Sequence, residues 1–158
     1  MILPMIARWC IRLLPIAYMG FIWFLSSRPS DAVVRLGRYD GLIKESLHLV
    51  EFGILYALFV LAFLTFGHLS RRHNRVAVIM AIAYGCIDEL HQAFVPSRSA
   101  DVIDIVKDVI GVCVAWYIVH RTYFQHDTSK IGRFLRRITL TLTPPIRNKP
   151  DRKSSADL

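Results

Sequence analysis

Four apolar segments constrain this chain more than any other feature, because each is close to the ~20 residues with which a helix crosses the hydrocarbon core of a bilayer. They cover Trp9–Ser27, Leu47–Phe66, Val76–Val95 and Val102–His120. The hydrophobic fraction of 54%, with a mean hydropathy of +0.39, exceeds the ~45–50% typical of soluble domains. These values exclude a soluble globular enzyme and a disordered chain. We therefore expect an all-α, polytopic membrane protein built as a four-helix transmembrane bundle.

The third and fourth segments contain ionisable residues, so a strict hydropathy test scores both of them poorly. These residues are Asp88, Glu89, His91, Asp104, Lys107 and Asp108. We still interpret both segments as spans, because ionisable groups within a membrane are typical of a functional bundle. For the first segment, the alternative is a cleaved signal peptide. It is disfavoured because Phe24-Leu25-Ser26 lacks the small-x-small cleavage pattern and more spans follow.

The distribution of basic residues predicts the orientation of the bundle. The N-terminus, the second loop and the tail after His120 hold 14 Lys and Arg residues, whereas the first and third loops hold 5. The positive-inside rule then puts both termini in the cytoplasm and the first and third loops outside. With a net charge of +8, membrane lipids with anionic headgroups are a better partner than nucleic acid.

The third loop and the tail carry local signals for helix ends. Pro96 is expected to stop the third helix, and Asp101 to cap the fourth, in a short antiparallel hairpin. Lys130–Thr143 places apolar and basic residues on opposite faces, which predicts a cytoplasmic amphipathic helix that binds anionic headgroups. The rest is expected to be a disordered basic tail. We thus expect a membrane domain over residues 1–125 and a tail over 126–158.

The polar residues of all four segments fall at a similar height. At ~1.5 Å per residue from the cytoplasmic arginines, they lie about 20–30 Å up, in the outer third of the membrane. Helical spacing also places them in three sets that each share a face: Lys44, His48 and Glu51; Tyr84, Asp88 and His91; Asp101, Asp104 and Asp108. They must face one another or a water-filled cavity open to the outside. Glu89 and Gln92 are offset by about 100° and could line a different wall.

Several of these residues also have a purely structural interpretation. His48 and Glu51 can form an ordinary intrahelical pair, and Asp101 can act only as a cap. Ser26 and Ser27 are expected to form interhelical hydrogen bonds rather than act as nucleophiles. Arg98 is either a solvated loop charge or a partner of the acidic residues below it. We predict the latter, with Arg98 paired to Asp88 or Glu89 and the other carboxylate facing His48 or His91.

In these motifs the chain resembles the VanZ-like family, small bacterial membrane proteins named after a teicoplanin-resistance protein. The family signature DEhHQxFxPxR corresponds to Asp88–Arg98, and the pattern on the following helix to Asp104, Asp108 and Gly111. The upstream pattern corresponds to Lys44, His48, Glu51, Phe52, Gly53 and Leu55, and the LSSxP end of the first helix to Leu25–Pro29. Ser97 and Asp108 depart from the usual Gly and Asn.

The resemblance implies a multi-pass protein of the bacterial cytoplasmic membrane, linked to lowered lipoglycopeptide sensitivity. We expect an outward-facing acidic pocket that binds or modifies a lipid-linked or cell-wall component. Whether this is an enzyme is left open. The candidate acid/base residues are Asp88, Glu89 and His91. The candidate substrate-binding residues are Arg28, Lys44, His48, Glu51, Gln92, Arg98, Asp104 and Asp108.

Two other functional classes and a metal site are the alternatives. No cofactor is expected, and a metal is less favoured because the chain has no H-E-x-x-H or comparable spacing. A small transporter would need a charged group reachable from both sides, and the inner two-thirds of the segments lack one. A non-catalytic scaffold or regulator would use the polar residues only to hold the bundle together.

Overall fold

The computed structural model describes residues 2–28, 40–96, 98, 101–125 and 129–142; the side chains of 2–4, 40–48 and 142 lie outside this description. The described elements are all helical, which confirms the all-α class. They are α1 (Ile2–Ser26), α3 (Asp40–Leu64), α4 (Arg71–Gln92), α5 (Val102–Val119), a π-helical turn η2 (His120–Gln125) and α6 (Lys130–Leu142).

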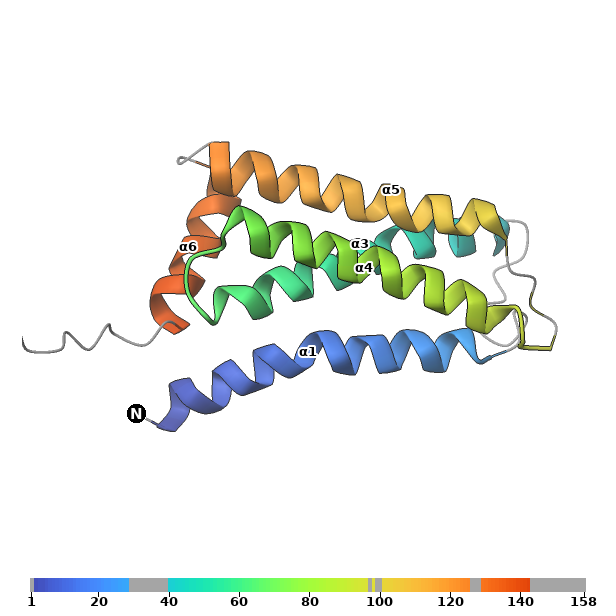
Figure 1. Cartoon of the computed structure of the whole chain (residues 1–158), viewed down its shortest axis with the longest axis horizontal. Coiled ribbons are helices and arrows are strands. Elements are labelled where there is room, and N and C mark those ends of the chain that lie inside the picture. The colour runs from blue at the N-terminus through green and yellow to red at the C-terminus, as the bar shows by residue number, and fades with distance from the viewer. Residues whose placement is uncertain (1, 29–39, 97, 99–100, 126–128, 143–158) are drawn as a thin grey trace, which may run out of the picture.

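Four long helices run along a common axis, with α4 and α3 between α1 and α5, while α6 lies across one end (Figure 1). At the opposite end, α1 and α4 finish and α3 and α5 begin; we call this the polar end. The end that carries α6 and the first turn of α4 is the basic end. Each predicted apolar segment thus overlaps one of these four helices.

The helix ends follow the local signals in the sequence. Ser70 caps α4, because its side chain accepts a hydrogen bond from the His73 N–H, and Asp101 caps α5 by accepting one from the Ile103 N–H at 2.9 Å. α4 ends at Gln92, earlier than the predicted Val95. A proline disfavours the helical conformation of the residue that precedes it. The chain therefore leaves the helix and forms a turn before Pro96.

The apolar core lies along α3, which supplies most of the large apolar side chains that are fully buried among the described residues. Those of Phe52, Leu55, Tyr56, Val60 and Leu64 are all at most 1% exposed. α5 crosses α3 at two glycines: a Cβ on Gly53 would lie 3.2 Å from the carbonyl oxygen of Gly111, and a Cβ on Gly111 would clash with the backbone of Leu49. At Gly111 only glycine permits this close approach, and at Gly53 a larger residue would make a tight contact, so these two residues set the spacing between α3 and α5.

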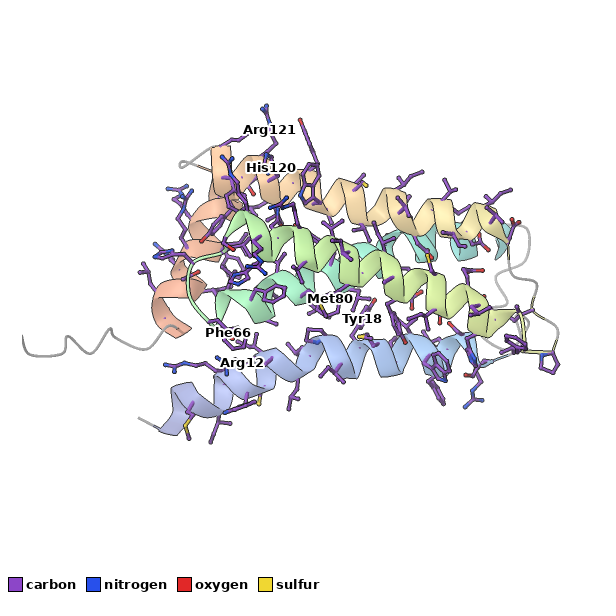
Figure 2. All side chains as sticks on the ribbon, viewed as in Figure 1. Arg12, Tyr18, Phe66, Met80, His120 and Arg121 are labelled. Atoms are coloured by element: carbon purple, nitrogen blue, oxygen red, sulfur yellow. The ribbon has the colours of Figure 1, made fainter. Side chains whose placement is uncertain are left out.

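At the basic end, Arg12 joins α1 to the end of α3. Its Nε donates a hydrogen bond to Thr65 Oγ1 at 2.8 Å, and its guanidinium lies 3.8 Å from the ring centre of Phe66. Figure 2 shows Arg12 and Phe66 facing each other across the two helices. A cation over an aromatic face is attracted by the ring quadrupole, so this contact closes that end of the α1–α3 interface.

The amphipathic helix predicted over Lys130–Thr143 is present as α6, and it packs on the bundle. Leu135 and Thr139 are buried, and Gly132 approaches the Thr122 carbonyl closely. Ile131 and Phe134 stay exposed, as do the basic side chains of Arg133 and Arg137. α6 is therefore tied to the bundle and still presents apolar and basic groups outward. The predicted disordered tail, from residue 143 on, lies outside the described residues.

Among the described residues, one helix is both long and apolar enough by composition to cross a membrane: α1, from Met5 to Ser26. The apolar part of α3, Leu49–Leu64, is shorter. α4 and α5 carry the charged residues that the sequence places near their ends, and they do not pass the same test. The four-span architecture therefore remains a proposal.

Candidate functional site

The polar end brings together side chains from α1, α4 and the turn that follows α4. Asp88 is at its centre, with 1% of its surface exposed. Its Oδ2 accepts hydrogen bonds from Ser26 Oγ and from Gln92 Nε2, both at 2.8 Å. A buried carboxylate is costly unless donors surround it, and here one donor comes from each of two helices. The interhelical bonding predicted for Ser26 is confirmed.

Gln92 connects Asp88 to Arg98. While its amide nitrogen donates to Asp88, its amide oxygen accepts a hydrogen bond from Arg98 Nη1 at 3.1 Å. Arg98 also donates to the carbonyl oxygens of Leu25 at 3.2 Å and Arg28 at 3.0 Å. A glutamine can donate and accept at once, so it links the guanidinium to the carboxylate through its neutral amide.

The prediction that Arg98 pairs directly with Asp88 or Glu89 is wrong. In the described part of the chain, Arg98 bonds to the Gln92 amide and to backbone carbonyls, and no ion pair joins it to either carboxylate. The physical reason is the fold of the turn. The helix stops at Gln92, so Arg98 returns over the end of α1, where the last carbonyls of that helix need donors.

His91 lies on the same side of α4, against α1. Its imidazole stacks on the indole of Trp23, with ring centres 3.8 Å apart and planes inclined by 18°. His91 Nε2 lies 3.0 Å from Ser27 Oγ, whose hydroxyl donates to the Trp23 carbonyl at 2.7 Å. Since that hydroxyl proton is already committed, Nε2 must be the donor to Ser27. Ser27 is therefore not arranged as an activated nucleophile. Its contact with His91 agrees with the interhelical hydrogen bond predicted for it.

Glu89 belongs to a different wall of the bundle, which confirms the offset predicted for it. Its side chain is buried, and its Oε2 accepts a hydrogen bond from the backbone N–H of Asp101 at 3.3 Å, at the start of α5. The same offset is predicted for Gln92, but Gln92 is not separated from Asp88, because its amide donates a hydrogen bond to that carboxylate. The two adjacent carboxylates thus lie at different interfaces. Asp88 lies at the interface of α4 with α1, and Glu89 lies at the interface of α4 with α5.

The acidic residues of α5 divide between the rim and the interior. Asp104 forms an ion pair with Lys107 at 2.8 Å, and both side chains are about one quarter exposed. Asp108 is buried, with its Oδ2 3.2 Å from the position that a Cβ on Gly85 would occupy. The absence of a side chain at Gly85 thus makes room for the carboxylate. Asp108 and Glu89 both lie between α4 and α5.

The remaining predicted residues lie farther from this cluster or outside the description. The Arg28 side chain is exposed, with its guanidinium 4.6 Å from the ring centre of Phe24. Glu51 is half-buried on α3. Lys44 and His48 fall on the first turns of α3, and their side chains lie outside the described residues. Among the described residues, no group of three or more His, Cys, Asp or Glu side chains is placed to hold a metal ion.

The sequence analysis did not include Trp23 among the candidate site residues, although its indole stacks on His91. A signal was present, because Trp23 is one helical turn before Ser27 and so shares its face. Gly53, Gly85 and Gly111 also contribute, by allowing α3, α4 and α5 to approach around the buried carboxylates. Their role depends on where the helices cross, which the sequence does not reveal.

Comparisons with known proteins support one assignment. No curated protein and no solved structure matched the chain. The VanZ/LLP1 family model matches residues 6–124, about three quarters of the chain. The match includes α1, α3, α4 and α5, and therefore the helices that form the polar end. The chain belongs to the VanZ/LLP1 family.

Proposed function

We propose that the chain is a multi-pass protein of the bacterial cytoplasmic membrane, in which α1, α3, α4 and α5 all cross the bilayer. The four helices have 25, 25, 22 and 18 residues, or about 27–37 Å at ~1.5 Å per residue, against a hydrocarbon core of ~30 Å. Family membership and the apolar α1 support a membrane protein.

The surface of the bundle supports the same placement. Each long helix exposes large apolar side chains, such as Phe21 on α1, Ile54 on α3, Ile79 on α4 and Val114 on α5. Monomeric soluble proteins rarely expose such extended apolar surface, whereas lipid contact requires it. With the basic residues at the opposite end, the positive-inside rule puts the polar end on the outer face of the membrane.

In this orientation, the polar end binds, and could modify, a lipid-linked or cell-wall component on the outer face. The observation that carries this proposal is the buried network Ser26–Asp88–Gln92–Arg98 beside the half-buried His91. Ionisable groups within a membrane are expensive and as a rule functional. The network fixes α4 against the end of α1. His91 lies beside the network and is only half-buried.

The contacts separate the residues by role. Arg98 uses its guanidinium, and Asp88 its Oδ2, within the network, so these two residues position the site. His91 has one ring nitrogen on Ser27, and in the described part of the chain the other has no hydrogen-bond partner, so it can accept a hydrogen bond from a ligand. Arg28, whose side chain is exposed at the end of α1, could hold a phosphate or carboxylate group.

A non-catalytic scaffold or regulator is the second candidate. The hydrogen bonds that Arg98 donates to two backbone carbonyl oxygens favour it. In that case, the network would only hold the end of the bundle together. A transporter has less support. Between the polar and basic ends, α3 packs large apolar and aromatic side chains, and residues 52–87 contain no acidic residue.

An antibiotic-susceptibility assay separates these functions. In a sensitive bacterial host that expresses the full chain, His91→Gln and Arg28→Gln should abolish any lowered sensitivity to teicoplanin. The matched control is Tyr84→Phe, which removes the hydrogen bond from Tyr84 to the Met19 carbonyl at the same α1–α4 interface. This variant should retain the lowered sensitivity to teicoplanin. Membrane levels and thermal stability of all variants must match. Full wild-type resistance in both test variants would contradict a binding site and favour the scaffold.

A further inference from the structure

A cleft at the basic end, far from the polar network, lies between α4 and α5. Its volume is about 360 Å³, and it is lined by Arg71, Asn74, Arg75, Trp116 and His120. On α4, Asn74 and Arg75 follow Arg71 by three and four positions, and His120, the first residue of η2, follows Trp116 of α5 by four, so each set lies on one helix face. Most of the lining consists of apolar atoms. The cleft is thus an apolar groove whose lining includes two arginine side chains.

The chain segments that line this cleft carry charge of one sign. Residues 52–87 and 109–126, which include all five lining residues, contain no Asp or Glu. Arg71 and Arg75 are exposed, and neither forms an ion pair or a side-chain hydrogen bond with any described residue. Both also lie in the first turns of α4, near the positive end of its helix dipole. Together these groups favour an anion.

Neighbouring side chains hold the uncharged groups of the cleft in place. The hydroxyl of Tyr56 donates a 2.6 Å hydrogen bond to Asn74 Oδ1, and Asn74 is 2% exposed. This bond orients the carboxamide and leaves its NH₂ group as the donor available at the cleft. His120 stacks between Trp116, at 5.1 Å, and Phe124, at 5.7 Å. Figure 2 shows His120 and Arg121 where α5 meets the basic end. A rigid, amphipathic cleft results.

We propose that this cleft binds one anionic phospholipid, with its phosphate held by Arg71, Arg75 and the Asn74 amide and an acyl chain along Trp116. Guanidinium groups recognise phosphate through paired hydrogen bonds. The apolar lining favours a lipid over a free phosphate ion, and basic pockets between spanning helices on the cytoplasmic side are suited to such headgroups. The proposal rests on the membrane placement proposed above but not on the function of the polar end.

Native mass spectrometry of the full chain, released from detergent, tests the proposal with phosphatidylglycerol and phosphatidylcholine as probes. The wild-type protein should retain one phosphatidylglycerol in preference to phosphatidylcholine. The double variant Arg71→Gln/Arg75→Gln should lower phosphatidylglycerol affinity by about fivefold for each arginine. The matched control, Arg72→Gln/Arg121→Gln, removes the same charge from exposed side chains that do not line the cleft, so its affinity should stay within about twofold of wild type.

Three results would overturn the proposal. The first is an unchanged phosphatidylglycerol affinity in Arg71→Gln/Arg75→Gln, and the second is an equal loss in both double variants, which would indicate general surface charge. The third is displacement of the lipid by millimolar inorganic phosphate, which would assign the cleft to a free anion. None of these readouts uses the antibiotic assay. Lipid retention without a resistance phenotype would therefore refute only the function proposed for the polar end.

Discussion

Gly111→Ala should destabilise the bundle, although the same change in most helices is stabilising. The new Cβ would clash with the carbonyl oxygen of Leu49 and lie 2.8 Å from its carbonyl carbon and 3.2 Å from its Cα. All three are backbone atoms of α3, so no side chain can rotate away. To restore ordinary contacts of ~3.5–4.0 Å with the carbonyl oxygen, α3 and α5 must move apart by about 1.5–2 Å.

The expected size of the effect comes from two opposing contributions. Overpacking a well-packed interior costs about 1–3 kcal/mol, and a rigid backbone clash belongs at the upper end of that range. Alanine gains about 0.5–1 kcal/mol over glycine in a helix interior. The net loss in the free energy of unfolding is therefore about 1–2 kcal/mol, which for a chain of this size lowers Tm by roughly 3–6 °C.

Thermal unfolding of the purified full chain in a mild detergent measures this effect, with two further alanine variants as internal standards. At Gly20, a Cβ would meet nothing within 4 Å, so Gly20→Ala should leave Tm unchanged or raise it. At Gly53, the nearest contact is 3.2 Å, so Gly53→Ala should fall between the other two. If Gly111→Ala melted at or above the wild-type temperature, the close crossing of α3 and α5 would be refuted.

Two further predictions concern the orientation and the polar network. In a background with Cys10, Cys86 and Cys113 replaced, single cysteines at Ser99 and Asp40 should react with an impermeant thiol reagent in intact cells, whereas one at the exposed Arg72 should react only after lysis; reversed labelling would refute the orientation. Arg98→Gln, which loses the guanidinium donors to Gln92, Leu25 and Arg28, should reduce the free energy of unfolding by about 1–3 kcal/mol in detergent melts. Arg28→Gln, at an exposed side chain, should not, and equal melting of the two variants would show that the network contributes no stability.

The location of the polar end could be predicted from the sequence because helix rise is constant. Counting from basic anchors placed Asp88 and His91 at the height of the end of α1, and the contacts with Ser26 and Ser27 agree with that count. The shared face of Tyr84, Asp88 and His91 is likewise a consequence of 3.6 residues per turn, and all three contact α1. Within a regular helix, the spacing of residues in the sequence is enough to predict their height along the axis and the face that they share.

The partner of Arg98 could not be predicted in this way, because it depends on a turn rather than a helix. Helical periodicity ends at Gln92, and six residues of chain then decide where the guanidinium lies. The sequence argument weighed charge against charge and paired Arg98 with a carboxylate. It did not count the last carbonyl groups of α1, which also need donors, or the ability of one amide to serve both charges.

The glycines show why the polar end and the packing of the bundle cannot be treated separately. Gly111 is one turn after Asp108, and Leu49 is two residues before Glu51, so the closest crossing of α3 and α5 is also where their acidic residues lie. Gly85 makes room on α4 for the Asp108 carboxylate at the same level. Any change that separates these helices would therefore displace buried carboxylates as well as weaken apolar packing. It follows that Gly111→Ala should impair both stability and whatever the polar end binds, whereas Arg28→Gln should impair binding alone.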